Sequence, residues 1–168
     1  SSATTINVSN FDTSKVTTMA NMFYGCSRLT ILDLSTFRTS SVTNMSHMFR
    51  GCSSLTSVDL SNFNTNSVTA MLYMFYGCSK LTQLDLHYFN TAANKDVENM
   101  FNGCSILETI FVSEYKSTTN TGWTTKGVTG GSGYYRNMFT GCTRLTGEYG
   151  TKYSSSRNDA TNFAYARP

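Results

Sequence analysis

Large apolar residues recur along this chain with a fixed period of 26 residues. All eight methionines fall into two aligned columns, and nine of the eleven phenylalanines fall into two more. The five cysteines form a further column, with spacings of 26, 26, 26 and 38 residues, at Cys26, Cys52, Cys78, Cys104 and Cys142. A period in the twenties is typical of a solenoid, in which each repeat buries its apolar face against its neighbours.

The first part of each repeat alternates apolar and polar residues, which is the pattern of a half-buried strand. The clearest examples are Leu32-Asp33-Leu34, Val58-Asp59-Leu60 and Leu84-Asp85-Leu86. Ile6-Asn7-Val8 and Ile110-Phe111-Val112 take the same place in the outer repeats. We therefore expect five short strands stacked in parallel, about 4.8 Å apart.

The second part of each repeat has the spacing of one face of a helix. Its apolar positions fall at i, i+3, i+6, i+7 and i+10, as in Val42, Met45, Met48, Phe49 and Cys52. Thr39 or Ser40 is placed to cap the start of such a helix, and Gly51 is placed for a left-handed cap at its end. The same design recurs over residues 16–25 and 68–77. A helix of about two turns needs its neighbours to hold it.

These patterns predict an α/β repeat solenoid, a leucine-rich-repeat-like stack of short parallel strands and short helices with period 26. We expect one array of about five repeats over residues 1–142, with an insertion near 114–134. Residues 143–168 are expected to form a C-terminal cap that ends the core. The chain has no initiator methionine and stops abruptly, so we expect it to be a piece of a longer protein.

Composition narrows the classes of partner. The formal net charge is +3 without a run of Lys and Arg, which argues against nucleic acid. No apolar stretch approaches the roughly 18 residues of a membrane span. The aligned cysteines lack the paired spacing of a zinc site or disulfide framework, so we expect buried free thiols.

No grouping of residues with catalytic chemistry is found in the sequence. His47 and His87 fall in different columns, and neither has a Cys or carboxylate at ligand spacing, so both are expected at the surface. The cysteines are expected to be too buried to act as nucleophiles. We therefore expect no enzyme activity, no cofactor and no metal.

Two features are candidates for partner binding. One is an outward column of carboxylates, Asp33, Asp59 and Asp85, with His87 in the flanking column. Carboxylates about 5 Å apart repel at roughly 1 kcal/mol in water, which a cation or basic partner would relieve; the alternative is a solvated column held by nearby Ser and Thr. The other feature is the insertion with Trp123, Tyr134 and Tyr135, since loop aromatics are enriched at binding hot spots. The alternative is that they cover the last repeat.

The phrase Val-Thr-x-Met-x-x-Met-Phe-x-Gly-Cys-Ser-x-Leu-Thr-x-Leu-Asp-Leu-Ser-x-Phe-x-Thr, which covers about residues 5–112 in its successive copies, resembles the BspA-type leucine-rich repeats of bacterial surface proteins. The resemblance implies an extracellular or cell-surface protein, with adhesion to protein or glycan partners in some members. It implies no catalytic residues. We expect a non-catalytic surface module for protein or host binding; the alternative is a structural spacer with no ligand of its own.

Overall fold

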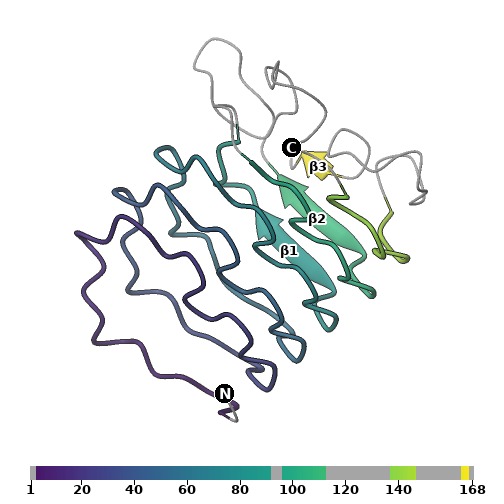
Figure 1. The fold of residues 1–168 in the computed structure, drawn as a ribbon, viewed down its shortest axis with the longest axis horizontal. Coiled ribbons are helices and arrows are strands. Elements are labelled where there is room, and N and C mark those ends of the chain that lie inside the picture. The colour runs from purple at the N-terminus through teal and green to yellow at the C-terminus, as the bar shows by residue number, and fades with distance from the viewer. Residues whose placement is uncertain (1–2, 92–95, 113–136, 147–163, 167–168) are drawn as a thin grey trace.

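The computed structural model describes residues 3–91, 96–112, 137–146 and 164–166. The chain runs through successive rungs that lie side by side, from the purple N-terminal rung to the green C-terminal one (Figure 1). We number the rungs one to five; their described residues are 4–29, 30–55, 56–81, 82–91 with 96–107, and 108–112 with 137–145. Each rung has a strand side, such as residues 30–37, and a turn side, such as residues 42–52.

The strand side of the later rungs forms a parallel sheet in the order β1-β2-β3 (Figure 1). Strand β1 spans Gln83–Leu86, β2 spans Thr109–Val112 and β3 spans Ala164–Ala166. In the register of β1 and β2, Leu84 pairs with Ile110 and Leu86 with Val112. All four of these side chains are buried while Asp85 is exposed, so the strands predicted at these two places are confirmed.

The strand side of the first three rungs is looser than predicted. Residues 32–34 and 58–60 keep an outward aspartate between inward apolar residues, but they form no strand. The backbone bonds that join these rungs here run from Thr30 N to Thr4 O, at 3.1 Å, and from Thr56 N to Thr30 O, at 3.2 Å. One bond per rung pair is too few for a β-ladder, which needs consecutive bonds.

The helix predicted on the turn side is wrong, because the described part of the chain has turns there and no helix. Within one rung the backbone bonds span three residues, as from Tyr24 N to Asn21 O and from Cys26 N to Phe23 O. Alternate N–H groups instead bond the next rung, as from Phe23 N to Met48 O at 2.9 Å. Consecutive turns in rung one begin two or three residues apart, at Met19, Asn21, Phe23 and Cys26, so they bury the positions that a short helix would bury.

Two backbone positions per rung explain why the helix does not form. In the first, φ lies between 55° and 63°; its members are Asn21, His47, Tyr73, Asn99 and Asn137. In the second, φ lies between 69° and 80°; its members are Gly25, Gly51, Gly77, Gly103 and Gly141. A residue with positive φ interrupts an α-helix, and two of them four residues apart leave no room for one. The glycine at 51 is thus left-handed as expected, but within a turn.

Thr39, which we expected to cap that helix, instead forms hydrogen bonds with the backbone of the next rung. Thr39 is buried; its hydroxyl accepts a bond from Asn64 N at 2.8 Å and donates to Asn64 O at 3.1 Å. Thr13 makes the same pair of bonds to the backbone of Arg38. A buried hydroxyl must be satisfied, and here it fastens each rung to the following one.

The core consists of aligned columns that run through the stack. The rings of Phe23, Phe49, Phe75, Phe101 and Phe139 stack with centroids 5.3–5.7 Å apart. All five cysteines are buried free thiols, as predicted. Each later thiol donates to a carbonyl of the preceding rung, for example from Cys52 Sγ to Phe23 O at 3.2 Å. Burial raises the pKa of the Cys52 and Cys142 thiols to about 12, so neither is a thiolate at neutral pH.

Candidate functional site

The outward carboxylates on the strand side serve the local backbone. Oδ1 of Asp33 accepts a bond from Ser35 N at 2.9 Å, and Oδ1 of Asp59 does the same from Ser61 N. Oδ1 of Asp85 accepts from His87 N at 3.0 Å. An aspartate that bonds the N–H two residues on is an Asx-turn, which stabilises the bend after each strand segment.

The pKa values of Asp33 and Asp59 follow from their bonds to the serine two residues on. The Ser35 backbone N–H, and then the Ser35 hydroxyl, lower the pKa of the exposed Asp33 carboxyl. The Ser61 N–H and hydroxyl likewise lower the pKa of Asp59, while partial burial and the neighbouring Asp33 act in the opposite direction. Local donors therefore stabilise the two charges more than their mutual repulsion destabilises them. This arrangement accounts for the column without a bound cation.

Of the other binding candidates predicted from the sequence, the structure describes His87 and does not describe the aromatic residues of the insertion. The backbone N–H of His87 bonds Asp85, and its half-buried ring lies edge-on to the Tyr88 ring with centroids 5.2 Å apart. Trp123 and Tyr134, with Tyr135, lie outside the described residues. The strand side thus carries the three aspartates and His87.

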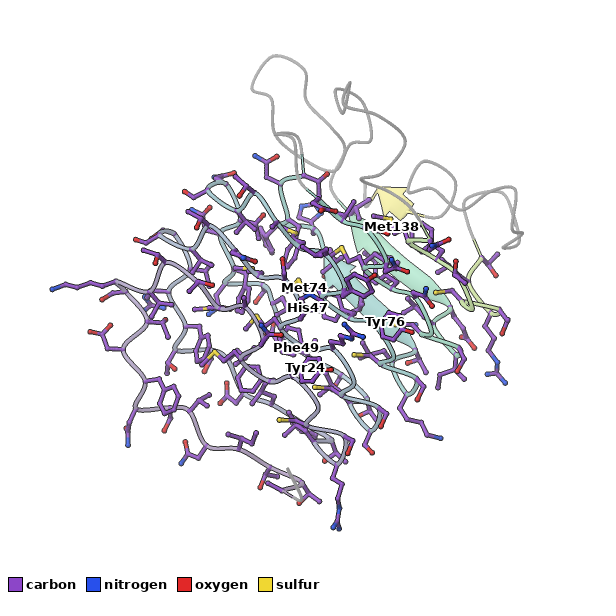
Figure 2. All side chains as sticks on the ribbon, in the orientation of Figure 1. Tyr24, His47, Phe49, Met74, Tyr76 and Met138 are labelled. Atoms are coloured by element: carbon purple, nitrogen blue, oxygen red, sulfur yellow. The ribbon has the colours of Figure 1, made fainter. Side chains whose placement is uncertain are left out.

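A second cluster lies on the turn side, and the sequence reasoning did not find it. We call it the tyrosine–arginine cluster; its members are Tyr24, His47, Arg50, Tyr73 and Tyr76. They come from rungs one, two and three, and Tyr24, His47 and Tyr76 are labelled in Figure 2. Two outward positions per rung, three residues apart, supply these side chains.

Arg50 is the centre of the cluster. Its guanidinium carbon lies over three tyrosine rings, 4.9 Å from the centroids of Tyr73 and Tyr76 and 5.6 Å from that of Tyr24. Each such contact contributes about 0.5–1 kcal/mol at an exposed site. The Arg50 Nη1 atom also lies 3.3 Å from His47 Nδ1. The arginine is therefore held in one place by rings from the rungs on both sides of it.

The rings also contact one another. The His47 ring stacks on Tyr73 with centroids 5.0 Å apart and planes 9° apart, and Tyr73 is tilted against Tyr76 at 5.5 Å. Tyr24 is 54% exposed, and the other four side chains are half-buried. The cluster is thus an ordered surface patch that solvent reaches.

Two members of the cluster occupy a strained backbone position. In rungs one, four and five this position is Asn, which tolerates positive φ, whereas rungs two and three carry His47 at 61° and Tyr73 at 56°. A bulky residue held at positive φ costs on the order of 1–3 kcal/mol. Strain of this kind is often found at functional sites.

The charge of the cluster is a single permanent cation. Burial, and then the positive charge of Arg50, lower the pKa of His47, so its ring is neutral at neutral pH and Nδ1 accepts a hydrogen bond from Arg50. Among the described residues, no carboxylate forms an ion pair with Arg50. Its described neighbours are the three tyrosine rings and the His47 ring.

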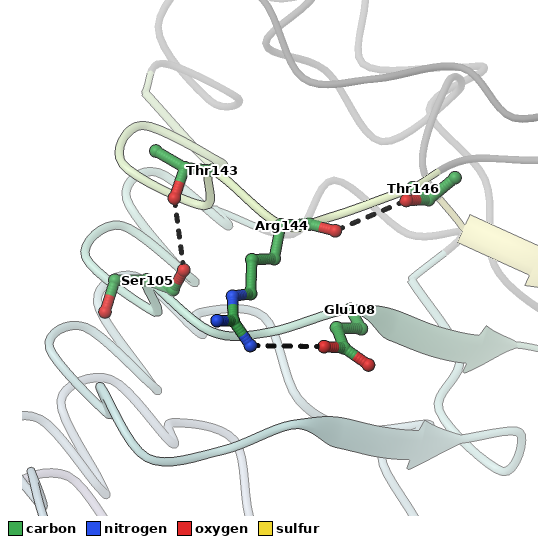
Figure 3. Close-up of polar contacts among 5 residues, drawn as sticks. All are labelled: Ser105, Glu108, Thr143, Arg144 and Thr146. Carbon is green, nitrogen blue, oxygen red and sulfur yellow. Dashed lines mark hydrogen bonds and ion pairs between the residues drawn. The ribbon is translucent and has the colours of Figure 1, made fainter.

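Arg144 in rung five shows the contrasting arrangement. Its Nη1 lies 3.5 Å from Oε1 of Glu108, and beside it the hydroxyl of Thr143 donates to Ser105 O at 3.2 Å (Figure 3). Both charged side chains are more than half exposed, so the pair contributes little to stability. An arginine on this scaffold can thus pair with a glutamate of its own rung, whereas no carboxylate in the described part of the chain pairs with Arg50.

The column alignment contains the signal for this cluster. Tyr24, Arg50 and Tyr76 share one column, and His47 and Tyr73 share the column three residues before it. Aligned positions of stacked rungs are neighbours in space, so the two columns predict contact. We expected His47 to face solvent on a helix, whereas its ring is half-buried against Tyr73.

Within the described ranges, no three His, Cys, Asp or Glu side chains are grouped so that they could hold a metal ion. The same part of the chain has no helix long and apolar enough to cross a membrane.

The fold and the cluster together define a class of protein, in which stacked 26-residue repeats carry a surface patch of rings around one cation. The chain belongs to the family described as "Mycoplasma protein of unknown function, DUF285", whose profile matches residues 1–115. The matched range contains the whole tyrosine–arginine cluster. No curated protein matches the chain, and no solved structure matches it.

Proposed function

We propose that this protein is a non-catalytic binding module displayed on a bacterial cell surface, where its exposed side chains contact a protein or glycan partner. The fold that we propose for it is a leucine-rich-repeat-like solenoid of the BspA type, with the turn side built from turns in place of helices. The cell-surface location and the BspA-type relation rest on the resemblance of the repeated phrase.

The observation that supports a binding role is the pair of rings at positive φ. A scaffold that only had to fold would keep Asn at this position, as rungs one, four and five do. His47 and Tyr73 instead accept strain and hold Arg50, together with Tyr24 and Tyr76, as an exposed patch. Aromatic residues and arginine are also the residue types most enriched at binding hot spots.

The experiment is capture of immobilised host matrix proteins and glycans by the labelled protein. In the test variant, Tyr24→Asn and Tyr76→Asn copy the residue that rung four has in this column, Asn102. The matched control changes Asp33, Asp59 and Asp85 to Asn on the strand side. We expect capture to fall at least about tenfold in the test variant and to stay within twofold in the control. The reverse pattern would move the binding surface to the aspartates.

A structural spacer is the second candidate, and the regular backbone bonds between rungs favour it. Each turn-side rung repeats the bonds of the last, for example from Phe49 N to Met74 O and from Phe75 N to Met100 O. A spacer predicts no capture by the wild-type protein. It also predicts that removing one 26-residue rung leaves the function of the protein unchanged.

A further inference from the structure

We infer that the tyrosine–arginine cluster binds a sugar that carries a carboxylate, through an ion pair with Arg50 and ring contacts with the tyrosines. This inference rests on the proposed binding function and names the ligand class for it.

The guanidinium of Arg50 is arranged to receive a carboxylate. It is planar and carries five N–H donors around its edge, and it matches a carboxylate with two parallel hydrogen bonds. Tyr73, Tyr76 and Tyr24 lie against it at 4.9, 4.9 and 5.6 Å, so the rings hold it in place without using its donors. His47 Nδ1 takes one donor at most. The other donors remain for a ligand, because the described residues supply no carboxylate.

The tyrosines supply the second half of the site. A pyranose ring has one face of C–H groups, which stacks on an aromatic ring, and hydroxyls around its edge, which bond phenol groups and other polar groups. Tyr24 is more than half exposed beside the cation, and Tyr76 lies on the other side of it, one rung further along. A sugar acid whose carboxylate pairs with Arg50 therefore finds a phenol ring beside it on either side.

The number of charges favours a sugar acid over other anionic partners. Nucleic acids, polysulfated chains and acidic peptides carry many charges, and their sites gather several Lys and Arg. The cluster holds one permanent cation surrounded by rings, and His47 next to it is neutral at neutral pH because burial and Arg50 lower its pKa. One cation beside aromatic surface suits a ligand with one negative charge on a compact body that is partly apolar.

The test measures binding of the purified chain to polymer-linked sugars at neutral pH and low salt. The probes are sialyllactose, which has one carboxylate, lactose, which is its uncharged counterpart, and polyglutamate, which represents an acidic peptide. The variants are Arg50→Gln, Arg50→Lys and, as the matched charge control, Arg144→Gln. Circular dichroism and thermal unfolding establish that each variant is folded.

We expect the wild-type chain to bind the sialyllactose polymer and not the lactose polymer. Arg50→Gln should lower this binding about tenfold or more, which is the effect of losing a charge-assisted hydrogen-bonded pair. Arg50→Lys should lower it several-fold, because lysine keeps the charge but loses the planar double contact. Arg144→Gln should stay within twofold of the wild type.

Four outcomes would overturn the inference. They are equal binding of the charged and uncharged sugars, wild-type binding by a folded Arg50→Gln variant, stronger binding to polyglutamate than to sialyllactose, and absence of any binding to sialyllactose by the folded wild type. The proposed function would still stand if the cluster variant Tyr24→Asn/Tyr76→Asn lost capture of some other partner, so failure of the ligand class and failure of the function are distinguishable.

Discussion

Two columns of aligned residues on the turn side have a left-handed backbone, but they differ in the residue types that they hold. The glycine column has φ between 69° and 80°, and every rung keeps Gly in it. The column four residues earlier has φ between 55° and 63°, and it holds Asn three times, His once and Tyr once. A Cβ added at Gly103 would lie 3.5 Å from Gly77 Cα, in contact with the previous rung. His47 and Tyr73 instead direct their rings into the surface cluster.

The difference teaches that backbone conformation alone does not choose the residue. Both positions are unfavourable for ordinary side chains because φ is positive. At the glycines of rungs two to five an added Cβ would also lie at van der Waals distance, 3.5–3.9 Å, from the previous rung, whereas the rings of His47 and Tyr73 reach the surface. Strain at the surface position is offset in part by ring stacking and by the Arg50 contacts. The column that holds His47 and Tyr73 therefore accepts side chains of different types without disturbing the core.

The largest difference in stability is expected between substitutions of an inward residue and of the outward residue next to it. Phe75 is fully buried between Phe49 and Phe101, so Phe75→Ala should lower the free energy of unfolding by about 3–5 kcal/mol. Tyr76, the next residue, is half-buried, and Tyr76→Ala should cost no more than about 1.5 kcal/mol. Urea denaturation of both variants measures the difference. Equal costs would contradict the inward and outward assignment of these two residues.

Substitutions in the two left-handed columns should change the free energy of unfolding in different directions. Gly103→Ala places a Cβ at φ 80° against Gly77, and we expect it to lower the free energy of unfolding by about 1–3 kcal/mol. Asn21→Gly relieves φ 63° at an exposed position, so it should be neutral or stabilising by up to about 1 kcal/mol. The same denaturation experiment applies. Destabilisation by both changes to the same extent would show that the columns do not differ.

The single change His47→Asn should alter stability by less than about 1 kcal/mol. Asn relieves strain at φ 61°, and the loss of the His47–Tyr73 stack removes about 0.5–1.5 kcal/mol, so the two effects nearly offset. Thermal unfolding of the variant beside the wild type measures the sum. A loss of several kcal/mol would make His47 a structural residue and remove the motive for a binding role.

The smallest effect concerns pH. Burial, and then Arg50, lower the folded pKa of His47 below the ordinary value of 6.5, so the unfolded chain takes up this proton first. The stability linked to neutral His47 is thus complete above about pH 6.5 and is lost as pH falls toward the folded pKa. We expect unfolding measured at pH 7.5 and 5.5 to show a larger loss in the wild type than in His47→Asn. Identical losses would mean that His47 titrates normally.

The sequence was most informative about residues that every rung repeats. The period predicted the buried Phe and Cys columns, because identical inward residues must meet when rungs stack. Two of the five predicted strands form, at Leu84–Leu86 and Ile110–Val112. The spacing of Met45, Met48 and Phe49 was misread as a helix, because a run of turns buries the same positions and the sequence does not show that N–H groups bond the next rung.

The candidate site was predicted less well than the core. The aspartates were chosen for their repeated charge, and their carboxylates turned out to bond the backbone two residues on. The tyrosine–arginine cluster was missed because its members differ in type, although they share columns. Left-handed φ at Tyr73 is also invisible in the sequence, because tyrosine is not a usual choice for that conformation, whereas histidine, like asparagine, is enriched there.

The most direct measurement uses the double variant His47→Asn/Tyr73→Asn, which gives all five rungs the same residue in this column. Its free energy of unfolding and its capture of the wild-type ligand are measured side by side. If the rings are there for binding, stability should stay within about 2 kcal/mol of the wild type while capture falls at least about tenfold. A folded double variant that captures the ligand as well as the wild type would contradict the account.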